Sequence, residues 1–515
     1  MDSFLQQHAD SVTGSISGWD RLRFRGTLRM LANVTGLGHF LSYTGRLFKD
    51  FKQHALDLSR QVRGDSLKVA EDAGRPIEHV NGPSVGKEEL ALQIAKRDGI
   101  QQGLICAITA VEGCWSFNMK SNPKTGDLDL IREYRKCQHI YHYQIHPTWG
   151  LMHTRLQTWL PFSITVNMNG REWLGRQMDS AGIEYRRHDN CFTWISDAAA
   201  ARKLADQQVT YDWETALGQV GRVANPAHRQ IVGNYNIPYY WSLDQSEWAT
   251  DIMFRSPQQL SALYPSLIRH GIESFGSRDV MRFMGRSVDK GITPRFAGEV
   301  VSDLCRRPEG MRIKHRVNHN SVKMYDKGGQ VLRVETTLND VHDLQSPRVE
   351  NGRKVWKRMR KGVADIPRRA EVSQKSNSRY LHALATVKTP LPLKTITQDL
   401  SQSIQWKNKS VRGLNLLGDN DATLLEACGR GEYLINGFRN RDLQSLLFAN
   451  ATDDPAEQKK RSGQITRKLR MLRAHGLIQK LPHTHRYMMS DKGRQVTAAL
   501  HAAREANIEK LSQAA

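Results

Sequence analysis

Two carboxylates lie beside predicted strands, where acidic side chains can hold metal ions. Asp20 belongs to a predicted strand that begins at Trp19, and Glu112 directly follows the apolar run GLICAITAV. Phosphodiester cleavage with two divalent cations needs acids at strand ends, because they hold both ions at the reacting phosphate. The pair therefore indicates a candidate metal site, although a long chain of mixed helices and strands supplies such pairs by chance.

A second group of reactive residues lies in the segment Ser321 to Asp340, which is typical of two short strands. Side chains alternate along a strand, so Tyr325 shares a face with two lysines and Glu335 shares one with Arg333. If these residues have no catalytic role, the pattern indicates a half-buried tyrosine and a surface ion pair between Arg333 and Glu335.

The same segment resembles rolling-circle replication initiators and related nickases of plasmids and phages, in which a Y-D-K or Y-N-K strand precedes an R-x-E strand. The resemblance covers about twenty residues. It implies that Glu335 is a ligand for Mg²⁺ or Mn²⁺ and that Tyr325 is the nucleophile that becomes linked to DNA. An enzyme of this kind would be a metal-dependent nickase or nuclease; no other cofactor is expected.

Histidines and aromatic residues are concentrated in the run CQHIYHYQIHPTWGLMH. Nickases with a His-hydrophobic-His strand place both histidines on one face, whereas His142 and His146 are four residues apart and His139 points the opposite way. The run departs from that pattern. Its alternation is typical of a packing surface or of one that stacks unpaired bases, with four aromatic residues available: Tyr141, Tyr143, Trp149 and Trp159.

Several common catalytic motifs are missing from the sequence. It contains no GxxxxGK[ST] phosphate-binding loop, no GxSxG nucleophile elbow and no HExxH zinc motif. Nucleotide-driven and serine-hydrolase functions lose support accordingly.

Charge gives the strongest constraint on the partner. The chain has 515 residues, with 75 Lys and Arg against 52 Asp and Glu, and 75 − 52 gives a net charge of +23. Clustered cations gain free energy by displacing the counterions condensed on phosphates, so DNA is the expected partner and RNA the alternative.

Other features of the composition bear on location. No stretch approaches the ~20 apolar residues of a membrane-spanning helix, and the polar start lacks the apolar core of a signal peptide. We expect a cytoplasmic protein, nucleoid-associated if bacterial, with no membrane partner. The six cysteines have no paired short spacing, which argues against a zinc ribbon or a disulfide framework and favours small buried hydrophobes.

The C-terminal residues 415–511 have a regular pattern of elements. Two short helices precede a longer one from about Glu457 to His475, with Asn440 in a position suited to capping the second. Ile465, Leu469 and Leu472 recur at helical spacing, so one face of the long helix is buried. Gly476 ends it, two short strands follow, and a closing helix resumes.

This order of elements resembles the winged-helix DNA-binding domain, and LRAHGLIQKLPHTHRYMMSDKG is similar to that family's passage from recognition helix to wing. The resemblance implies that the long helix enters the major groove while the wing meets backbone or minor groove. From Glu457 to Arg494 the chain carries eleven Lys or Arg against two acids, a net of +9. The alternative is a protein-contact module. The expected nucleic-acid-binding residues are Arg461, Arg467, Lys468, Arg470, Arg473, His485 and Arg486.

The remaining chain is predicted to be a mixed body. The run WDRLRFRGTLR predicts a strand with a basic face, antiparallel hairpins follow between Gly103 and Val166, and helices dominate from Tyr211 to Arg307. The segment 351–370 has eight Lys or Arg against Asp365, a net of +7, and predicts a basic hinge. Further phosphate contacts are expected from Arg21, Arg23, Arg25, Arg353, Lys354, Lys357, Arg358, Arg360 and Lys361.

The sequence as a whole predicts an α+β multidomain protein: a mixed α/β body with an antiparallel sheet and a helical layer, and a C-terminal winged helix. Its expected parts are 1–100 (basic α/β), 101–210 (antiparallel β), 211–345 (helical layer with a returning hairpin), 346–412 (basic hinge) and 413–515 (winged helix). We expect a duplex-DNA-binding protein, encoded by a mobile element. The alternatives are a metal-dependent nickase or nuclease and an RNA-binding or RNA-guided protein. The oligomeric state is left open.

Overall fold

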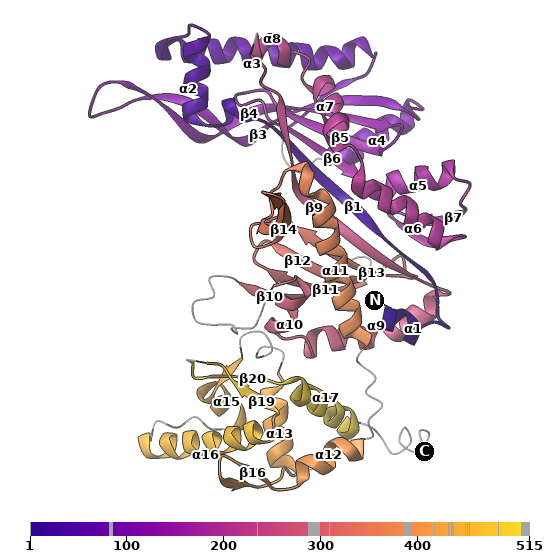
Figure 1. The fold of residues 1–515 in the computed structure, drawn as a ribbon, viewed down its shortest axis with the longest axis vertical. Helices are drawn as coiled ribbons and strands as arrows, with labels where there is room; N and C mark the ends of the chain where they lie inside the picture. The colour runs from indigo at the N-terminus through magenta and orange to yellow at the C-terminus, as the bar shows by residue number, and fades with distance from the viewer. Residues whose placement is uncertain are drawn as a thin grey trace. The chain divides into compact units, whose positions relative to one another are not determined.

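The computed structural model describes residues 2–505 apart from 82–85, 234, 287–298, 308–309, 386–392, 417, 431–432, 434–436, 449, 451, 453 and 483. Helices and strands are both abundant, so the expected α+β class is confirmed (Figure 1). The chain forms two compact units. The large-sheet unit comprises Gly14–Asp251 and Thr337–Gln374, and the module-bearing unit comprises Met1–Thr13, Ile252–Thr336 and Lys375–Ala515.

A twisted sheet forms the large-sheet unit, with strand order β9-β1-β6-β5-β4-β3-β2. Its pairings from β1 through β6, β5 and β4 to β3 are antiparallel, which confirms the hairpins expected there, and β2 joins β3 in parallel. The strands are β1 (Val12–Leu28), β2 (Ile77–Val80), β3 (Gly103–Ser121), β4 (Leu128–His146), β5 (Gly150–Gln157), β6 (Ile164–Asn169) and β9 (Tyr239–Phe254).

Strand β1 shows why this sheet has two different faces. Leu22, Phe24 and Leu28 are buried, while the arginines between them are exposed, as the alternation predicts. The shorter elements of the unit are η1 (Met30–Ala32), α2 (Val34–Tyr43), η2 (Phe48–Asp50), α3 (Phe51–Asp72), α4 (Lys87–Arg97), α5 (Gly170–Ser180), β7 (Tyr185–His188), β8 (Cys191–Ile195), α6 (Ala198–Gln207), η3 (Gln208–Thr210), α7 (Trp213–Ala224), α8 (His228–Val232) and η4 (Val363–Asp365).

Four antiparallel strands, in the order β10-β11-β12-β13, lie in the module-bearing unit with helices α9 and α10. The two strands expected between Ser321 and Asp340 are both present, as β12 and β13. The elements are α1 (Asp2–Gln7), α9 (Pro257–Glu273), α10 (Ser277–Phe283), β10 (Val300–Arg307), β11 (Gly310–Val317), β12 (Asn320–Lys327) and β13 (Val331–Leu338); α11 (Ile366–Ala385) contributes residues to both units.

The C-terminal module, which we define as residues 393–505, belongs to the module-bearing unit. Its helices enclose one apolar core together with a three-stranded sheet of order β18-β20-β19 (Figure 1). The elements are α12 (Leu393–Ser401), β16 (Ile404–Trp406), β17 (Lys409–Val411), α13 (Asp419–Cys428), β18 (Phe438–Arg439), α15 (Asn440–Leu447), α16 (Pro455–Ala474), β19 (Ile478–Lys480), β20 (Arg486–Met489) and α17 (Asp491–Glu505).

Two expectations about the body need correction. The helical layer expected over 211–345 contains the sixteen-residue strand β9, which lies next to β1. The basic hinge expected over 346–412 begins as a hairpin, β14 (Gln345–Glu350) with β15 (Arg353–Arg358), and continues into α11. Arg369 is fully buried and donates to the Ser246 hydroxyl and to the carbonyls of Leu243 and Leu338, so this segment is part of the folded unit.

Candidate nucleic-acid interface

Helix α16 is the central element of the candidate interface in the C-terminal module. Asp454 caps its start by accepting a hydrogen bond from the Ala456 N–H at 3.0 Å, and Gly476 follows its end with a positive φ of 74°. Ile465, Leu469 and Leu472 are buried in the module core, as their spacing predicts. Their burial fixes which face of the helix is left outside.

The outer face of α16 is cationic. The neighbouring residues Thr466 and Arg467 are exposed, and Arg470 is exposed one turn later. Lys459 and Lys460 are exposed nearer the start of the helix. An exposed helical row of this kind has the donors and the width that suit a major groove.

Arg461, in contrast, is bound within the module. Its guanidinium contacts Glu457 at 3.2 Å, lies 5.0 Å from the centre of the Phe448 ring and donates to the Asn450 carbonyl. Only 18% of its side chain is exposed. Arg461 therefore holds the preceding loop against α16. These contacts give it a structural role in place of the predicted contact with nucleic acid.

Asn440 also differs from expectation, because it does not cap α15. The Asp442 carboxylate performs that task by accepting from the Arg439 N–H at 2.7 Å. The Asn440 amide instead donates to the Ser462 carbonyl at 2.8 Å and to the Thr466 hydroxyl at 2.9 Å. Asn440 therefore ties α15 to α16 and fixes the position of the cationic helix.

A small hairpin, β16 with β17, lies against the second half of α16, in a stretch that was predicted to be part of the basic hinge. Trp406 from this hairpin faces the guanidinium groups of Arg470 and Arg473, which lie 5.9 Å and 5.5 Å from its ring centre. Lys407 lies over the same ring at 5.1 Å. Cation–π contacts of this geometry hold three cations around one aromatic side chain.

Beyond α16, strands β19 and β20 form the predicted hairpin. Lys480 and His485 are exposed near its end, and Arg486 is half-buried and donates to the Gly437 carbonyl at 3.3 Å. His483, which lies between the two strands in the sequence, is outside the described residues. Lys468 is half-buried on α16, and its charge helps to lower the pKa of Asp421. His485 is thus the more accessible of the two predicted wing residues.

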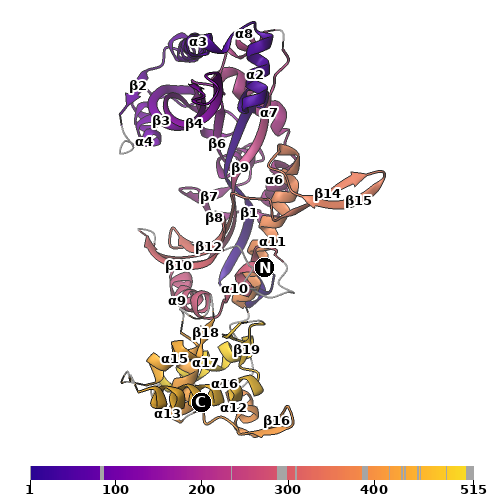
Figure 2. The same cartoon turned by 90° about the vertical axis from the view of Figure 1, so that its left-hand side faces the viewer.

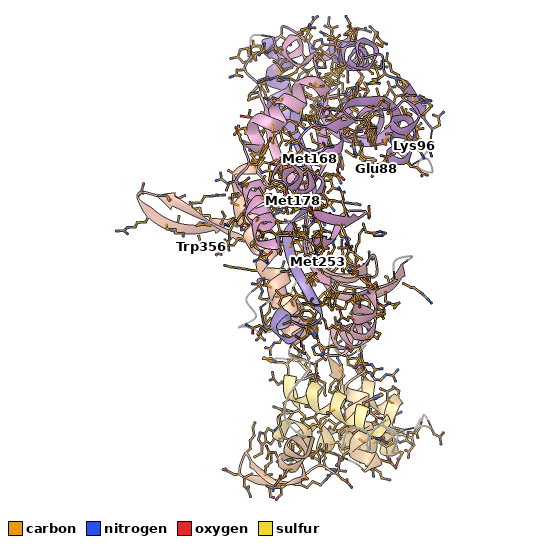
Figure 3. The ribbon with its side chains drawn as sticks, turned by 90° about the vertical axis from the view of Figure 1, so that its right-hand side faces the viewer. Glu88, Lys96, Met168, Met178, Met253 and Trp356 are labelled. Atoms are coloured by element: carbon orange, nitrogen blue, oxygen red, sulfur yellow. The ribbon has the colours of Figure 1, made fainter. Side chains whose placement is uncertain are left out.

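The large-sheet unit carries its own basic projection, the arm β14–β15 (Figure 2). Residues 345–358 include five Lys or Arg and one Glu, a net of 5 − 1 = +4. Trp356 is 53% exposed on this arm (Figure 3), and Val349 is 77% exposed. The expected contacts in this stretch are all exposed on the arm or directly after it, except Lys361, which is half-buried: Arg353, Lys354, Lys357, Arg358, Arg360 and Lys361.

Asp365 anchors the base of the arm. It accepts hydrogen bonds from the Ser346 hydroxyl at 2.9 Å, from the Arg360 N–H at 2.8 Å and from the Arg348 guanidinium. Burial acts to raise the pKa of this carboxyl, but these donors hold it below its ordinary value. The arm is therefore fixed at its base and exposed along its length.

Beside that base lie two adjoining pockets of about 960 and 750 Å³. Both are lined by Arg29, Tyr240 and Arg360, and the Arg29 guanidinium lies 3.4 Å from the centre of the Tyr240 ring. Arginine and tyrosine at one opening offer hydrogen bonds to phosphate oxygens and a surface on which a base can stack. No sequence pattern brought these residues together.

On β1, the predicted arginine row is present, and its members have different surroundings. Arg21 lies 4.0 Å from Glu247 and Arg25 lies 3.8 Å from Asp244, both acids of the neighbouring β9. Arg23 is exposed between them, opposite Asn167 of β6. Because the acids neutralise the outer arginines, the row carries less free positive charge than its sequence indicates.

The predicted nucleophile and metal ligand are close together in the module-bearing unit. The Tyr325 hydroxyl donates to Glu335 Oε2 at 2.8 Å, and the Lys323 ammonium donates to Oε1 at 2.6 Å. Glu335 is 2% exposed. Burial acts to raise the pKa of Glu335, but the Lys323 charge, the nearby Arg333 charge and the hydrogen bonds from Lys323 and Tyr325 together hold it below its ordinary value.

The proposed pairing of Asp20 with Glu112 is wrong. Asp20 is on β1 and Glu112 on β3, with three strands between them. Asp20 accepts from the Asn190 amide at 2.7 Å, whereas Glu112 contacts Lys87 at 3.0 Å. Burial opposes ionisation of Glu112, but Tyr141, Lys87 and Arg155 together lower its pKa to about 2.

The histidine-rich run is mostly interior, so it offers little surface to a base. His142 is buried and contacts the Ser66 carbonyl at 3.0 Å, and His139 is fully buried. Trp149, Tyr141 and Tyr143 are also buried, and among the four aromatic residues only Trp159 is partly exposed. The packing interpretation of this run is therefore the one that the structure supports.

Among the described residues, no helix combines the length and apolar character needed to cross a membrane. No protein-family model, curated protein or solved structure matches the chain.

Proposed function

We propose that this chain binds nucleic acid and that its C-terminal module is a winged helix that holds duplex DNA. The order helix, strand, helix, helix, two-stranded hairpin and helix supports the assignment, as does the three-stranded sheet β18-β20-β19. The observation that carries the proposal is the exposed row on α16 that includes Arg467 and Arg470, beside the hairpin that bears His485.

Charge supports DNA as the partner more than a second protein. A protein-contact helix would expose apolar side chains at the centre of its outer face, whereas Thr466, Arg467 and Arg470 are exposed there. Binding should therefore weaken steeply as salt rises, because each neutralised phosphate releases counterions.

The large-sheet unit supports a second, independent contact with phosphates through its arm and the pockets beside Arg29. Its exposed Trp356 suits stacking or insertion at a base step, and the arm's charge suits the backbone. Strands presented this way are a known means of reading either groove.

The test is equilibrium binding of the full chain to a short labelled duplex at several salt concentrations. Arg467→Ala with Arg470→Ala should weaken binding several-fold. The matched control is Lys96→Ala with Arg97→Ala, which removes the same charge from an exposed helix end outside the proposed surfaces. Unchanged affinity in the α16 variant would make the module a protein-contact domain, and preference for a matched RNA would move the proposal to RNA.

A second candidate function is metal-dependent DNA strand cleavage, favoured by the hydrogen bond between Tyr325 and Glu335. A carboxylate beside a tyrosine hydroxyl can hold a cation at the phosphate that the tyrosine attacks. Incubation of the full chain with supercoiled plasmid and Mg²⁺ or Mn²⁺ tests this cleavage activity. Nicking that is lost in Tyr325→Phe and in Glu335→Gln would support the proposal, and an intact plasmid under all conditions would exclude it.

A further inference from the structure

Two cysteines and one histidine that are far apart in the sequence meet on one face of the large sheet. Strands β3 and β4 are paired so that Glu112 lies opposite Cys137 and Cys114 lies opposite Arg135. Residues two apart on a strand share a face, so Cys114 is diagonal to Cys137, and His139 lies on the same side. The ligand atoms of these three residues lie within 4.8 Å of one another.

The cluster is enclosed by the fold. Cys114 is 7% exposed, Cys137 is 9% exposed and His139 is fully buried. His139 Nδ1 lies 3.2 Å from the Cys137 carbonyl oxygen and 4.0 Å from the Cys137 sulfur. Within the described part of the chain, His139 Nε2 is buried with no hydrogen-bond partner. A buried nitrogen in that state is costly unless something binds it.

Two thiolates and a neutral imidazole are a donor set that Zn²⁺ prefers. With Zn–S bonds of about 2.3 Å and a Zn–N bond of about 2.0–2.1 Å, tetrahedral donors are separated by roughly 3.6–3.8 Å. The three ligand atoms now lie within 4.8 Å of one another, so small side-chain rotations would bring them to the separations that zinc requires. A neutral imidazole has one nitrogen with a free lone pair and one that carries a proton, so His139 can bind the ion through one ring nitrogen while the other donates a hydrogen bond.

Two larger polar side chains beside the cluster are already engaged. Glu112, which lies opposite Cys137, contacts Arg155 at 2.8 Å and accepts from the Tyr141 hydroxyl at 2.7 Å. Gln157, which lies opposite His139 on β5, donates to the carbonyls of Trp115 and Trp159. The cluster thus supplies three donors, namely two sulfurs and one ring nitrogen.

We propose that Cys114, Cys137 and His139 form a binding site for a zinc ion. A divalent ion held by two thiolates and an imidazole leaves no net charge on the cluster, which suits its burial. The ion links β3 to β4 near the middle of a long hairpin and so stabilises the sheet. This proposal is independent of nucleic-acid binding.

The site can be tested on the full chain, purified without chelator and analysed for bound metal. We expect close to one zinc per chain, and a Co²⁺-exchanged sample should show the near-ultraviolet absorption of thiolate-to-cobalt charge transfer. Cys114→Ser, Cys137→Ser and His139→Asn should each lower the zinc content and weaken that band. Cys106→Ala is the matched control, because Cys106 is buried in the same strand outside the cluster.

A variant that fails to fold would obscure this result, so a second measurement uses the wild-type chain. Bound zinc should protect Cys114 and Cys137 from alkylation more than Cys305, which is partly exposed, and a chelator should remove the protection. The proposal is overturned if zinc added to the reduced chain is not retained and no cobalt band appears. A Cys114–Cys137 disulfide as the stable form of the unreduced protein would also overturn it.

Discussion

Lys323 and Glu335 form an ion pair of 2.6 Å across β12 and β13, with Glu335 almost completely buried. Tyr325 binds the other carboxylate oxygen, so both oxygens of Glu335 have donors within the same unit. A surface pair of Glu335 with Arg333 was one expectation for this segment. Arg333 and Glu335 are both buried, so they are not a surface pair, and Glu335 binds Lys323 inside the fold, where breaking the ion pair is expensive.

Removal of one partner tests the cost of this buried pair. Glu335→Gln removes the carboxylate charge that lies 2.6 Å from the Lys323 ammonium, whose side chain is 14% exposed. We expect a loss of about 3 kcal/mol in the free energy of unfolding. Urea unfolding measures it. Lys323→Met with Glu335→Met should recover most of the loss, and a double variant as unstable as the single one would contradict the ion-pair explanation.

The pH dependence of the C-terminal module should follow Asp421. Its carboxylate binds the Arg412 guanidinium through two hydrogen bonds of 2.8 Å and accepts from the Asn415 N–H at 2.9 Å. Burial acts to raise the pKa of Asp421, but Arg412 and the Asn415 N–H outweigh it, and the pKa in the folded chain lies below its ordinary value. Because the pKa of Asp421 is lower in the folded chain than in the unfolded chain, its ionised carboxylate stabilises the fold at pH values above the unfolded-state pKa. This stabilisation is lost as the pH falls through the folded-state pKa.

Thermal unfolding between about pH 7 and pH 2 checks this expectation. The melting temperature of the module should decrease as the pH drops below about 4, which is the ordinary pKa of an aspartate. Asp421→Asn should be less stable at neutral pH, and its melting temperature should depend less on acid. An identical acid dependence in the variant and the wild type would contradict the assignment to Asp421.

The arm β14–β15 should contribute to binding without contributing to stability. Arg353 and Lys354 are exposed near its turn, so Arg353→Glu with Lys354→Glu changes charge where no core contact exists. We expect weaker binding to nucleic acid, most clearly at low salt, and an unchanged melting temperature. The control is Lys96→Glu with Arg97→Glu. Equal binding by the arm variant and the wild type would remove the arm from the interface.

Local patterns predicted those elements whose own residues decide their structure. The spacing of Ile465, Leu469 and Leu472 predicted the buried face of α16, and the alternation along β1 predicted its buried and exposed faces. The arm was missed because its charge resembles that of a linker. Its signal was Asn351-Gly352, which has φ values of 50° and 73° and is the preferred dipeptide of a two-residue hairpin turn.

Features that depend on pairing between distant segments were beyond local patterns. Cys114 and Cys137 are brought together only by the register of β3 with β4, which spacing in the sequence does not reveal. Trp406 likewise reaches Arg470 because its hairpin packs on α16. Strand β9 was missed because polar residues interrupt its apolar positions, and its neighbours in the sheet decide its structure.

Trp406 and Arg467 should affect DNA binding in different ways. Arg467 is exposed on α16, so we expect Arg467→Ala to remove a phosphate or base contact. Loss of one phosphate contact would reduce the slope of log affinity against log salt by about 1. Trp406→Ala removes no charge, but it frees the side chains of Arg470 and Arg473. We expect Trp406→Ala to lower affinity several-fold with an unchanged salt slope, and Trp406→Phe to restore most of it. If Trp406→Ala instead lowers the slope as Arg467→Ala does, the hairpin controls how many phosphates the module reaches, and the tryptophan is more than a support for two arginines.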